Sequence, residues 1–313
     1  MNKIYIALCT YNGERFLPRF LESLQRQTRP ADAIIAYDDG STDRTVSILE
    51  AFTAKMPLQI FAGNQNHGHR AAFNQALSLV QKNASPEDEI ALADQDDEWL
   101  PDKLEILENA LKHQSLVFGD ARVIDAWGNE IGHSWRKFAS LPQHVSLKSQ
   151  IAGVNNVTGC LSLFRASLLE SILPIPEGVT VHDRWIAMIA ERHGGILPIP
   201  NPVIKYRLHD SNAIGGKPIP KMSETLKLQK QWVKTILQNA HRIALEKEEI
   251  QFAETLLQLH RARETEAISL RFLPWIYRQR HQLFPSGSFK KRIQKILFSC
   301  IGLPLAKKVW GKS

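Results

Sequence analysis

The sequence has little cysteine. It holds three, Cys9, Cys160 and Cys300, spread over 313 residues. An odd number of distant cysteines excludes a disulfide framework, and without a CxxC pair there is no zinc pattern. No apolar run reaches the roughly 18 residues of a membrane-spanning helix. The apolar start ends at Tyr11 and is too short for a signal peptide. We therefore expect a protein of a reducing compartment, the cytoplasm.

The overall composition is ordinary, with 43% hydrophobic and 23% charged residues. These values exclude intrinsic disorder, collagen and low-complexity repeats, and the length corresponds to about two domains. The net charge of +7 hides an asymmetry. Residues 1–216 contain 20 basic and 25 acidic side chains, whereas residues 217–313 contain 19 and 7. This asymmetry predicts a basic extension, residues 217–313, that meets an anionic partner.

The first 118 residues alternate between short apolar runs and amphipathic stretches. Strands are expected at 4–9, 33–37, 58–62, 89–93 and 116–118, and helices at 14–27, 43–54, 69–82 and from Pro101. The alternation predicts an α/β fold with a mostly parallel sheet flanked by helices, which binds ligands at the carboxyl ends of its strands. Strand-like pieces at 157–164 and 203–206 then enclose a helix at 182–193. From about residue 220 we expect helices.

A polar cluster follows each of the first four predicted strands, at residues 10–14, 38–43, 64–70 and 94–97. One such cluster alone is typical of a turn or a helix cap, but four at one sheet edge favour a binding site. The last, Asp94-Gln95-Asp96-Asp97, has three carboxylates that repel one another unless a cation lies among them. Such oxygen ligands suit Mg²⁺ or Mn²⁺, and Mg²⁺ is usually shared with substrate phosphates. The alternative is a solvated acidic loop.

As an ordered set, these motifs resemble those of inverting family 2 glycosyltransferases with the GT-A fold. The set comprises Asp-Asp-Gly-Ser-Thr-Asp at 38–43, Asn-x-Asn-x-Gly-x-x-x-Ala-x-Asn at 64–74, and Asp-x-Asp-Asp ahead of Trp-Leu-Pro-Asp-Lys-Leu at 99–104. The segment at 92–99 is similar to the rhamnosyltransferase branch, which builds bacterial surface polysaccharides such as O-antigen. The resemblance covers residues 3 to about 215. It implies a Rossmann-like GT-A catalytic domain at 1–216, followed by the helical extension at 217–313.

The resemblance implies a nucleotide-diphosphate sugar donor, dTDP- or UDP-linked, with L-rhamnose as the sugar that the branch suggests. In this reading Thr10, Tyr11 and Glu14 line the nucleoside site, Asp39 takes the base, and Arg70 lies near the base or diphosphate. Asp94 and Asp96 match the family's Asp-x-Asp, which binds ribose and a divalent metal, Mg²⁺ or Mn²⁺. Asp97 can replace either, so the metal ligand stays open among the three. His209, in Tyr206-Arg-x-His, is a further metal or diphosphate ligand in this reading, and a structural histidine in the alternative.

Inversion needs a general base on the acceptor side of the sugar. His182-Asp183-Arg184-Trp185 resembles the base motif of the family, which implies that Asp183 is the base. Asp183 also stands where an aspartate caps a helix. Relatives more often have Glu-Asp, so it stays open whether His182 tunes Asp183 or binds the acceptor. The resemblance places His182, Trp185 and Gly159 on the acceptor side. A Gln-x-x-Arg-Trp motif is missing from the sequence, which favours adding one sugar per acceptor.

The basic extension mixes cationic and apolar residues, as in Lys-Lys-Arg-Ile-Gln-Lys-Ile-Leu-Phe at 290–298. This pattern predicts an interfacial helix on an anionic leaflet. The resemblance implies that this leaflet is the inner face of a bacterial cell membrane. In the alternative, the apolar stripe of the extension packs on the catalytic domain. No nucleic-acid motif is present and no nucleic-acid partner is expected.

The sequence thus predicts a metal-dependent inverting glycosyltransferase with a glycan or lipid-linked acceptor. Two other classes stay open. A nucleotidyltransferase would need a basic grip on a triphosphate, for which the first loop offers only Arg15. A non-catalytic membrane- or carbohydrate-binding module would not need Asp94, Asp96 and Asp183.

Overall fold

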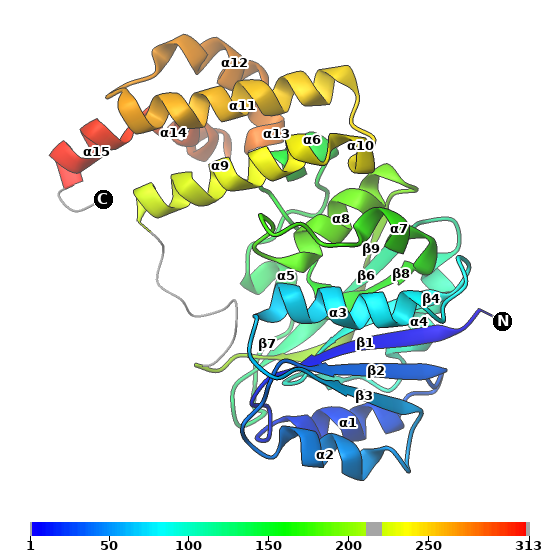
Figure 1. Ribbon diagram of the computed structural model, residues 1–313. Coiled ribbons are helices and arrows are strands. Elements are labelled where there is room, and N and C mark those ends of the chain that lie inside the picture. Colours follow the sequence, from blue (N-terminus) through cyan, green and yellow to red (C-terminus); the bar gives the residue numbers. More distant parts are fainter. Residues whose placement is uncertain (1, 211–220, 311–313) are drawn as a thin grey trace. The chain divides into compact units, whose positions relative to one another are not determined.

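The computed structural model describes residues 2–210 and 221–310 (Figure 1). Within them, nine strands form one sheet in the order β3-β2-β1-β4-β8-β6-β9-β5, and β7 pairs with β6. The strands are β1 Ile4–Thr10, β2 Ala33–Asp38, β3 Leu58–Ala62, β4 Glu89–Asp94, β5 Glu98–Trp99, β6 Leu116–Ile124, β7 Glu130–Gly132, β8 Ser162–Arg165 and β9 Ile196–Arg207.

The first four strands along the chain form the parallel half of the sheet. β1 pairs in parallel with both β2 and β4, and β2 pairs in parallel with β3. The polar clusters that follow these strands therefore share one edge of the sheet, as the sequence pattern predicts. Figure 1 shows α3 on one side of β1–β3 and α1 and α2 on the other. The expected α/β sheet flanked by helices is confirmed.

The other half of the sheet is mixed. β8 runs antiparallel to both β4 and β6, whereas β6 and β9 are parallel. The strand expected at 157–164 is wrong in its first part, because residues Gly159–Leu161 form the 3₁₀ turn η1. The Ser162 hydroxyl donates to the Gly159 carbonyl at 2.7 Å, which closes this turn locally. Only Ser162–Arg165 pairs as a strand.

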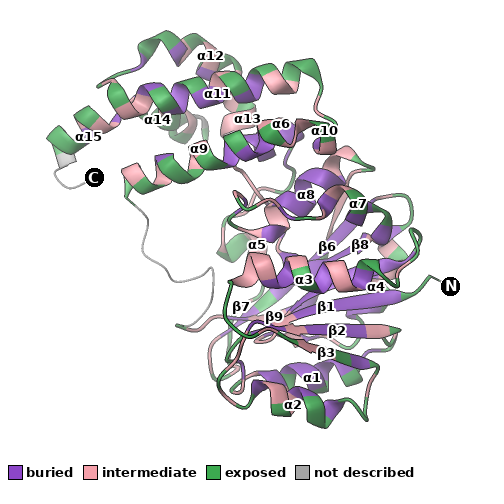
Figure 2. Ribbon diagram, in the orientation of Figure 1, coloured by how far each residue is buried: buried purple, intermediate pink, exposed green. Residues whose placement is uncertain are grey.

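Helical periodicity explains the helices around this sheet. In α1, Pro18 lies in the first turn, where its missing N–H costs nothing, and the buried residues recur at helical spacing. The helices and 3₁₀ turns are α1 Leu17–Gln25, α2 Thr45–Phe52, α3 His69–Gln81, α4 Lys103–Leu111, α5 Trp135–Phe138, η1 Gly159–Leu161, η2 Ala166–Leu168, α7 Leu169–Ile172 and α8 His182–Arg192. Figure 2 shows β1 and much of α8 as buried.

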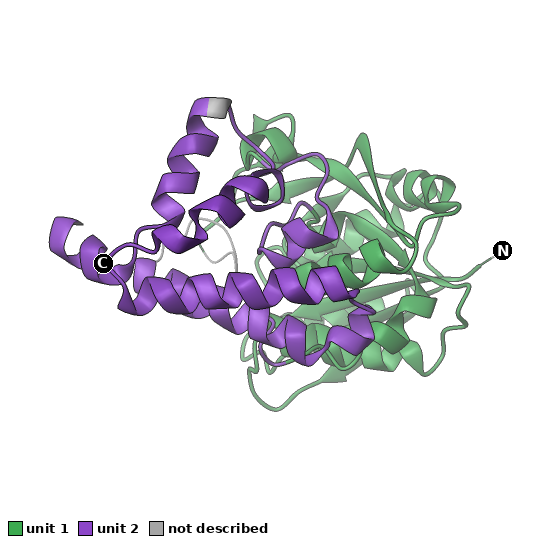
Figure 3. Ribbon diagram, turned by 90° about the horizontal axis from the view of Figure 1, so that it is seen from above, with its two compact units in different colours: residues 1–140, 157–176, 181–216 green, residues 141–156, 177–180, 217–313 purple. Residues whose placement is uncertain are grey.

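The chain divides into two compact units (Figure 3). The first unit holds the sheet and comprises residues 1–140, 157–176 and 181–216. The second unit comprises residues 141–156, 177–180 and 217–313. Its helices and 3₁₀ turn are α6 Leu147–Ile151, α9 Met222–Gln238, α10 Ala240–Ile243, α11 Lys247–Thr265, η3 Leu270–Phe272, α12 Leu273–Arg278, α13 Arg280–Leu283, α14 Phe289–Ser299 and α15 Leu303–Trp310.

The helices of the second unit pack around their own apolar core. α9 contacts α11, and α11 contacts α15. Trp232 on α9 is buried and donates from its indole nitrogen to the Gln150 carbonyl at 3.0 Å. Among the described residues, no helix combines the length and the apolar character needed to cross a bilayer.

Candidate active site

The loop after β2 presents Asp39, whose side chain is buried in the first unit. Its Oδ2 accepts hydrogen bonds from the backbone N–H groups of His67 at 3.0 Å and Gly68 at 2.7 Å. Its Oδ1 is also buried, and no described residue donates to it. Gly40 allows this arrangement, since its φ is +80° and a Cβ there would lie 2.7 Å from the Gln65 backbone. Asp39 thus keeps one carboxylate oxygen ready to accept a hydrogen bond.

Asp38, its neighbour, serves the loop itself. It accepts hydrogen bonds from the hydroxyls of Thr10 and Ser41 at 2.7 and 2.6 Å. The Thr10 side chain is therefore buried and engaged within the protein. This network joins the end of β1 to the end of β2.

The other residues predicted for the nucleoside site lie in the loop after β1. Tyr11 is 42% exposed, and its backbone N–H and carbonyl are both bound by the Gln95 side-chain amide at 3.0 and 2.8 Å. The Glu14 carboxylate accepts hydrogen bonds from the backbone and guanidinium of Arg44. The structure therefore brings Tyr11 to the acidic loop through Gln95, and ties Glu14 to the start of α2.

Arg70 and Asn74 lie on α3 and both bind the backbone of Ile175. The Arg70 guanidinium donates to the Ile175 carbonyl at 3.2 Å, and the Asn74 side chain accepts from the Ile175 N–H at 2.7 Å. Asn74, the last residue of the motif at 64–74, thus has a structural contact.

The carboxylates of the acidic loop after β4 separate into two groups. Asp96 Oδ2 lies 2.8 Å from Nε2 of His209, a residue 113 positions further along the chain. Asp97 is buried and accepts a hydrogen bond from the backbone N–H of Arg207 at 3.1 Å. Ligand atoms of Asp94, Asp97 and Cys160 lie within 4.8 Å of one another.

Arg207 holds this loop in place. Its side chain is buried and donates to the Asp96 carbonyl at 2.9 Å and to the Asp125 carbonyl at 3.2 Å, and it pairs with Glu98 at 2.5 Å. The Tyr-Arg-x-His motif therefore supplies one structural cation and, two residues later, the imidazole beside Asp96.

The two groups differ in their fitness for a hard cation. The Asp96 carboxylate suits Mn²⁺ or Mg²⁺, whereas the His209 imidazole is a better donor for a transition metal such as Mn²⁺ than for Mg²⁺. The Cys160 thiol is a poor donor for such a cation, because burial, with the charges of Asp97 and Asp94, raises its pKa well above the ordinary value. Thiols bind metal as thiolates, which favour softer cations. The residues present therefore fit a divalent cation at Asp96 and His209.

Lys103 lies close to the inner group, which consists of Asp94, Asp97 and Cys160. The sequence pattern indicated no role for this lysine. Its side chain is fully buried, donates to the Cys160 carbonyl at 2.6 Å, and lies 3.2 Å from the centre of the Trp99 ring. Burial lowers the pKa of Lys103 to about 7, while Cys160, Asp97 and Asp94 raise it. Burial and Asp96 raise the pKa of Asp94 to about 7, while Lys103 lowers it. The ammonium and carboxylate forms therefore favour each other.

The predicted base, Asp183, lies in the first turn of α8. Burial raises its pKa to about 6, whereas Arg184 and hydrogen bonds from the backbone of Gly159 and Arg184 lower it. A Cβ on Gly159 would lie 3.0 Å from His182 Nε2 and 3.5 Å from Asp183 Cβ, so a glycine permits this close approach. The structure thus brings Gly159, His182 and Asp183 together.

His182 and Trp185 are both enclosed by protein. The His182 ring stacks on Phe73 with a centroid distance of 3.8 Å, and burial lowers its pKa well below the ordinary value. The Trp185 indole is fully buried and donates to the Ile172 carbonyl at 2.9 Å. The structure therefore places Trp185 in the core of the first unit rather than beside the polar side chains.

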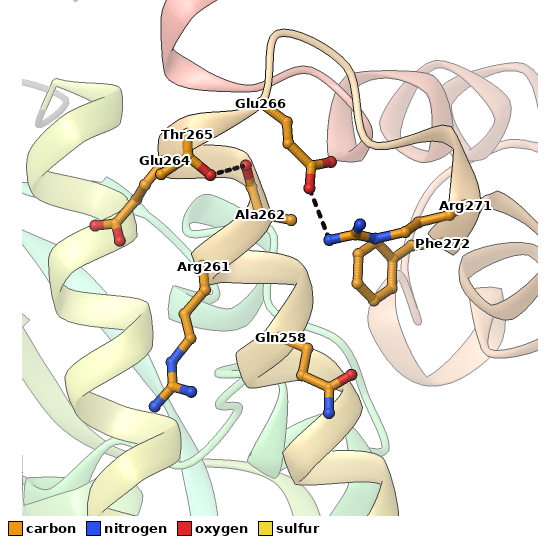
Figure 4. A pocket seen from close by; sticks show the side chains of 8 residues that line it. All are labelled: Gln258, Arg261, Ala262, Glu264, Thr265, Glu266, Arg271 and Phe272. Atoms are coloured by element: carbon orange, nitrogen blue, oxygen red, sulfur yellow. Dashed lines mark hydrogen bonds and ion pairs between the residues drawn. The ribbon is translucent and has the colours of Figure 1, made fainter.

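A separate hollow of about 500 Å³ lies within the second unit (Figure 4). It is lined by residues of α11 and of the turn that follows, among them Gln258, Arg261 and Phe272. Glu266 and Arg271 form an ion pair at 2.7 Å beside it. None of the predicted site residues lines this hollow.

Comparison with known proteins identifies the family. Residues 5–173 match the model of glycosyl transferase family 2. An uncharacterized glycosyltransferase of Nostoc is 28% identical over 67% of this chain and 66% of its own length. The dTDP-rhamnosyl transferase RfbG of Shigella flexneri is 33% identical over 67% of this chain and 74% of its own length. The matched segment thus spans just under two thirds of the Nostoc protein and more of RfbG.

The solved structures agree on the fold. The crystal structure of Staphylococcus aureus TarS residues 1–349 with UDP-GlcNAc matches with a TM-score of 0.59 at 17% identity, over 95% of this chain and 81% of that one. The GT-A fold that the motifs implied is confirmed, and neither a nucleotidyltransferase nor a non-catalytic module is favoured. The chain belongs to glycosyl transferase family 2 and is a glycosyltransferase.

Proposed function

We propose that this enzyme transfers one sugar from a pyrimidine nucleotide-diphosphate donor to a hydroxyl of a glycan or lipid-linked acceptor, with inversion and with the help of Mg²⁺ or Mn²⁺. The proposal that the nucleobase of the donor is a pyrimidine rests on Asp39. Its buried Oδ1 has no donor among the described residues, and the N3–H group of thymine or uracil is a donor of the right kind. Adenine has an acceptor at the corresponding ring nitrogen. Guanine has an N–H donor there but places its 2-amino donor beside it, and Asp39 Oδ2 already accepts from His67 and Gly68. The likeness to a dTDP-rhamnosyl transferase supports a dTDP-linked donor with L-rhamnose as the sugar.

Asp96 and His209 are the residues that would hold the cation, and Asp94 would lie beside the ribose. When bound, the cation supplies Lewis-acid neutralisation of the diphosphate leaving group. Arg207 donates a hydrogen bond to the Asp96 carbonyl and so fixes the backbone of the acidic loop. Asp96 is therefore positioned before a ligand binds.

Asp183 would act as the general base. As the acceptor oxygen bonds to the anomeric carbon, the bond from that carbon to the diphosphate oxygen breaks, and the nucleoside diphosphate leaves with the electron pair. The proton of the acceptor hydroxyl passes to the Asp183 carboxylate. The Gly159 amide, which donates to that carboxylate, orients it.

Calorimetric titration of dTDP, UDP and GDP in the presence of Mn²⁺ tests which nucleobase the enzyme binds. We expect dTDP and UDP to bind at least about 10-fold more tightly than GDP, because thymine and uracil present one N–H donor to the single open oxygen of Asp39, whereas guanine presents two adjacent donors, N1–H and N2–H₂. Asp39→Asn should reduce this preference, since an amide can present its N–H₂ group to the base. Equal binding of GDP to the wild-type enzyme would contradict the proposal.

We also propose that the second unit binds an anionic membrane surface, where a lipid-linked acceptor would reside. The last acidic residue of the chain is Glu266, and residues 267–313 contain ten Lys or Arg. On α14, Lys291, Lys295 and Phe298 are exposed and spaced four and three residues apart, so they share a face. Other large apolar side chains of this segment, Leu270, Tyr277, Leu297 and Val309, are more than half exposed. Cationic and apolar groups exposed together fit the headgroup region of an anionic bilayer.

A further inference from the structure

Lys103 is unusual because a lysine is almost never fully buried unless it is paired. Its position in α4 explains the burial, since Lys103, Leu107 and Leu111 recur every four residues on the helix face that packs inward. An isolated ammonium group there would be costly, so the surrounding charges must compensate for it.

One hydrogen bond and one charge interaction define what Lys103 does. Its ammonium group donates to the Cys160 carbonyl at 2.6 Å, within the turn η1. It also interacts with the charges of Asp97 and Asp94, which belong to the acidic loop. One side chain thus joins the acidic loop to the turn whose Gly159 amide binds Asp183.

We propose that Lys103 is a positioning residue: through the Cys160 carbonyl its buried ammonium group holds the turn that orients Asp183, and its charge offsets part of the negative charge of Asp94 and Asp97. This inference rests on the proposed function for its catalytic consequence. With Lys103 offsetting one of the two inner negative charges, the exchangeable divalent cation is left to Asp96 and His209.

A double-substitution cycle tests the charge pairing without any substrate. Lys103→Met and Asp97→Asn are each expected to lower the urea midpoint of unfolding, because the first leaves the buried carboxylates without a counter-charge and the second leaves the buried ammonium group with Asp94 alone. Combining them removes Lys103 together with one of its two carboxylates, so the doubly substituted chain should have a higher midpoint than Lys103→Met alone. Lys82→Met, at an exposed lysine, serves as the control and should leave the midpoint unchanged. Strictly additive losses would overturn the pairing.

The affinity for Mn²⁺ distinguishes the charge of Lys103 from a merely structural role, because the two predict changes in opposite directions. In the presence of UDP, Lys103→Met should bind Mn²⁺ roughly 10-fold more tightly, because a positive charge near the cation is removed. Damage to the fold would weaken binding instead. Electron paramagnetic resonance of free Mn²⁺ measures this affinity, and an unchanged or weaker affinity would contradict the inference.

Turnover completes the test. We expect the release of nucleoside diphosphate per UDP-binding site to fall about 10-fold or more in Lys103→Met. The KM for the donor should change less than about 2-fold, since the substitution acts on Asp183 and not on the nucleobase site. Unchanged turnover per site would overturn the positioning role. If the wild-type enzyme bound neither Mn²⁺ nor UDP, the proposed function would fail, while the unfolding cycle would still decide the pairing of Lys103.

Discussion

Asp96 Oδ2 and His209 Nε2 lie 2.8 Å apart, although 113 positions separate the two residues in the sequence. The pair combines a carboxylate from the loop after β4 with an imidazole just beyond β9. We predict that Asp96→Asn weakens Mn²⁺-dependent nucleotide binding by at least about 10-fold, or 1.4 kcal/mol, because a neutral amide attracts the cation less.

Calorimetry with dTDP and Mn²⁺ checks this prediction, and circular dichroism checks that the fold is kept. Glu105→Gln, on α4, removes a carboxylate outside the acidic loop and provides the matched control. Full nucleotide affinity in Asp96→Asn would remove Asp96 from the metal site.

The substitution Asp183→Asn tests whether Asp183 is the general base. The amide is nearly isosteric but cannot take the proton of the acceptor hydroxyl. General-base catalysis contributes roughly 10²–10⁴-fold, so turnover should fall by that order while the affinity for dTDP stays the same. Release of nucleoside diphosphate gives the turnover. Near-normal turnover would move the base to another residue, with His182 the first to examine.

The pKa of Asp183 makes the pH dependence predictable. Burial raises this pKa to about 6, and the base works only as the carboxylate. Turnover should therefore be high above pH 7 and fall about 10-fold for each unit of pH below 6, where the protonated form dominates. A profile of kcat/KM against pH measures this limb, and its loss in Asp183→Asn would assign it. A limb that persists unchanged in the variant would belong to another group.

The proposed membrane binding would depend on the exposed basic face of α14. Each Lys or Arg near an anionic leaflet contributes about 1 kcal/mol, so reversing Lys290, Lys291 and Lys295 to Glu should weaken binding at least about 100-fold. Sedimentation with phosphatidylserine-containing vesicles measures this, and added salt should weaken it as well. The control reverses three exposed lysines of the first unit, Lys55, Lys82 and Lys137. Equal binding of wild type to neutral vesicles, or none to either, would leave the extension with a structural role.

The parallel half of the sheet could be predicted because its signals are local. Strands β1 to β4 are short apolar runs with amphipathic helices between them, and the polar loops follow from the strand directions. The bounds of β3 were predicted to the residue, since its pattern ends at Gly63 on one side and Pro57 on the other.

The remaining features depend on contacts between distant segments. Nothing local marks the reversal of β8, because the turn at 159–161 is as apolar as a strand and is closed by the Ser162 hydroxyl. Composition also did not reveal that residues 141–156 and 177–180 join the second unit. Lys103 had a usable signal, since it shares the spacing of Leu107 and Leu111, but its partners Asp97 and Cys160 are known only from the fold.

The most direct test of the account is the release of nucleoside diphosphate from dTDP-L-rhamnose, UDP-GlcNAc and GDP-mannose by the wild-type enzyme, with water as the acceptor of the sugar. We predict turnover with a pyrimidine donor, dependence on Mn²⁺ or Mg²⁺, and its loss with EDTA. Asp183→Asn should reduce it by roughly 10²–10⁴-fold. Equal turnover of GDP-mannose, or full turnover in EDTA, would contradict the roles given to Asp39 and to the Asp96–His209 pair.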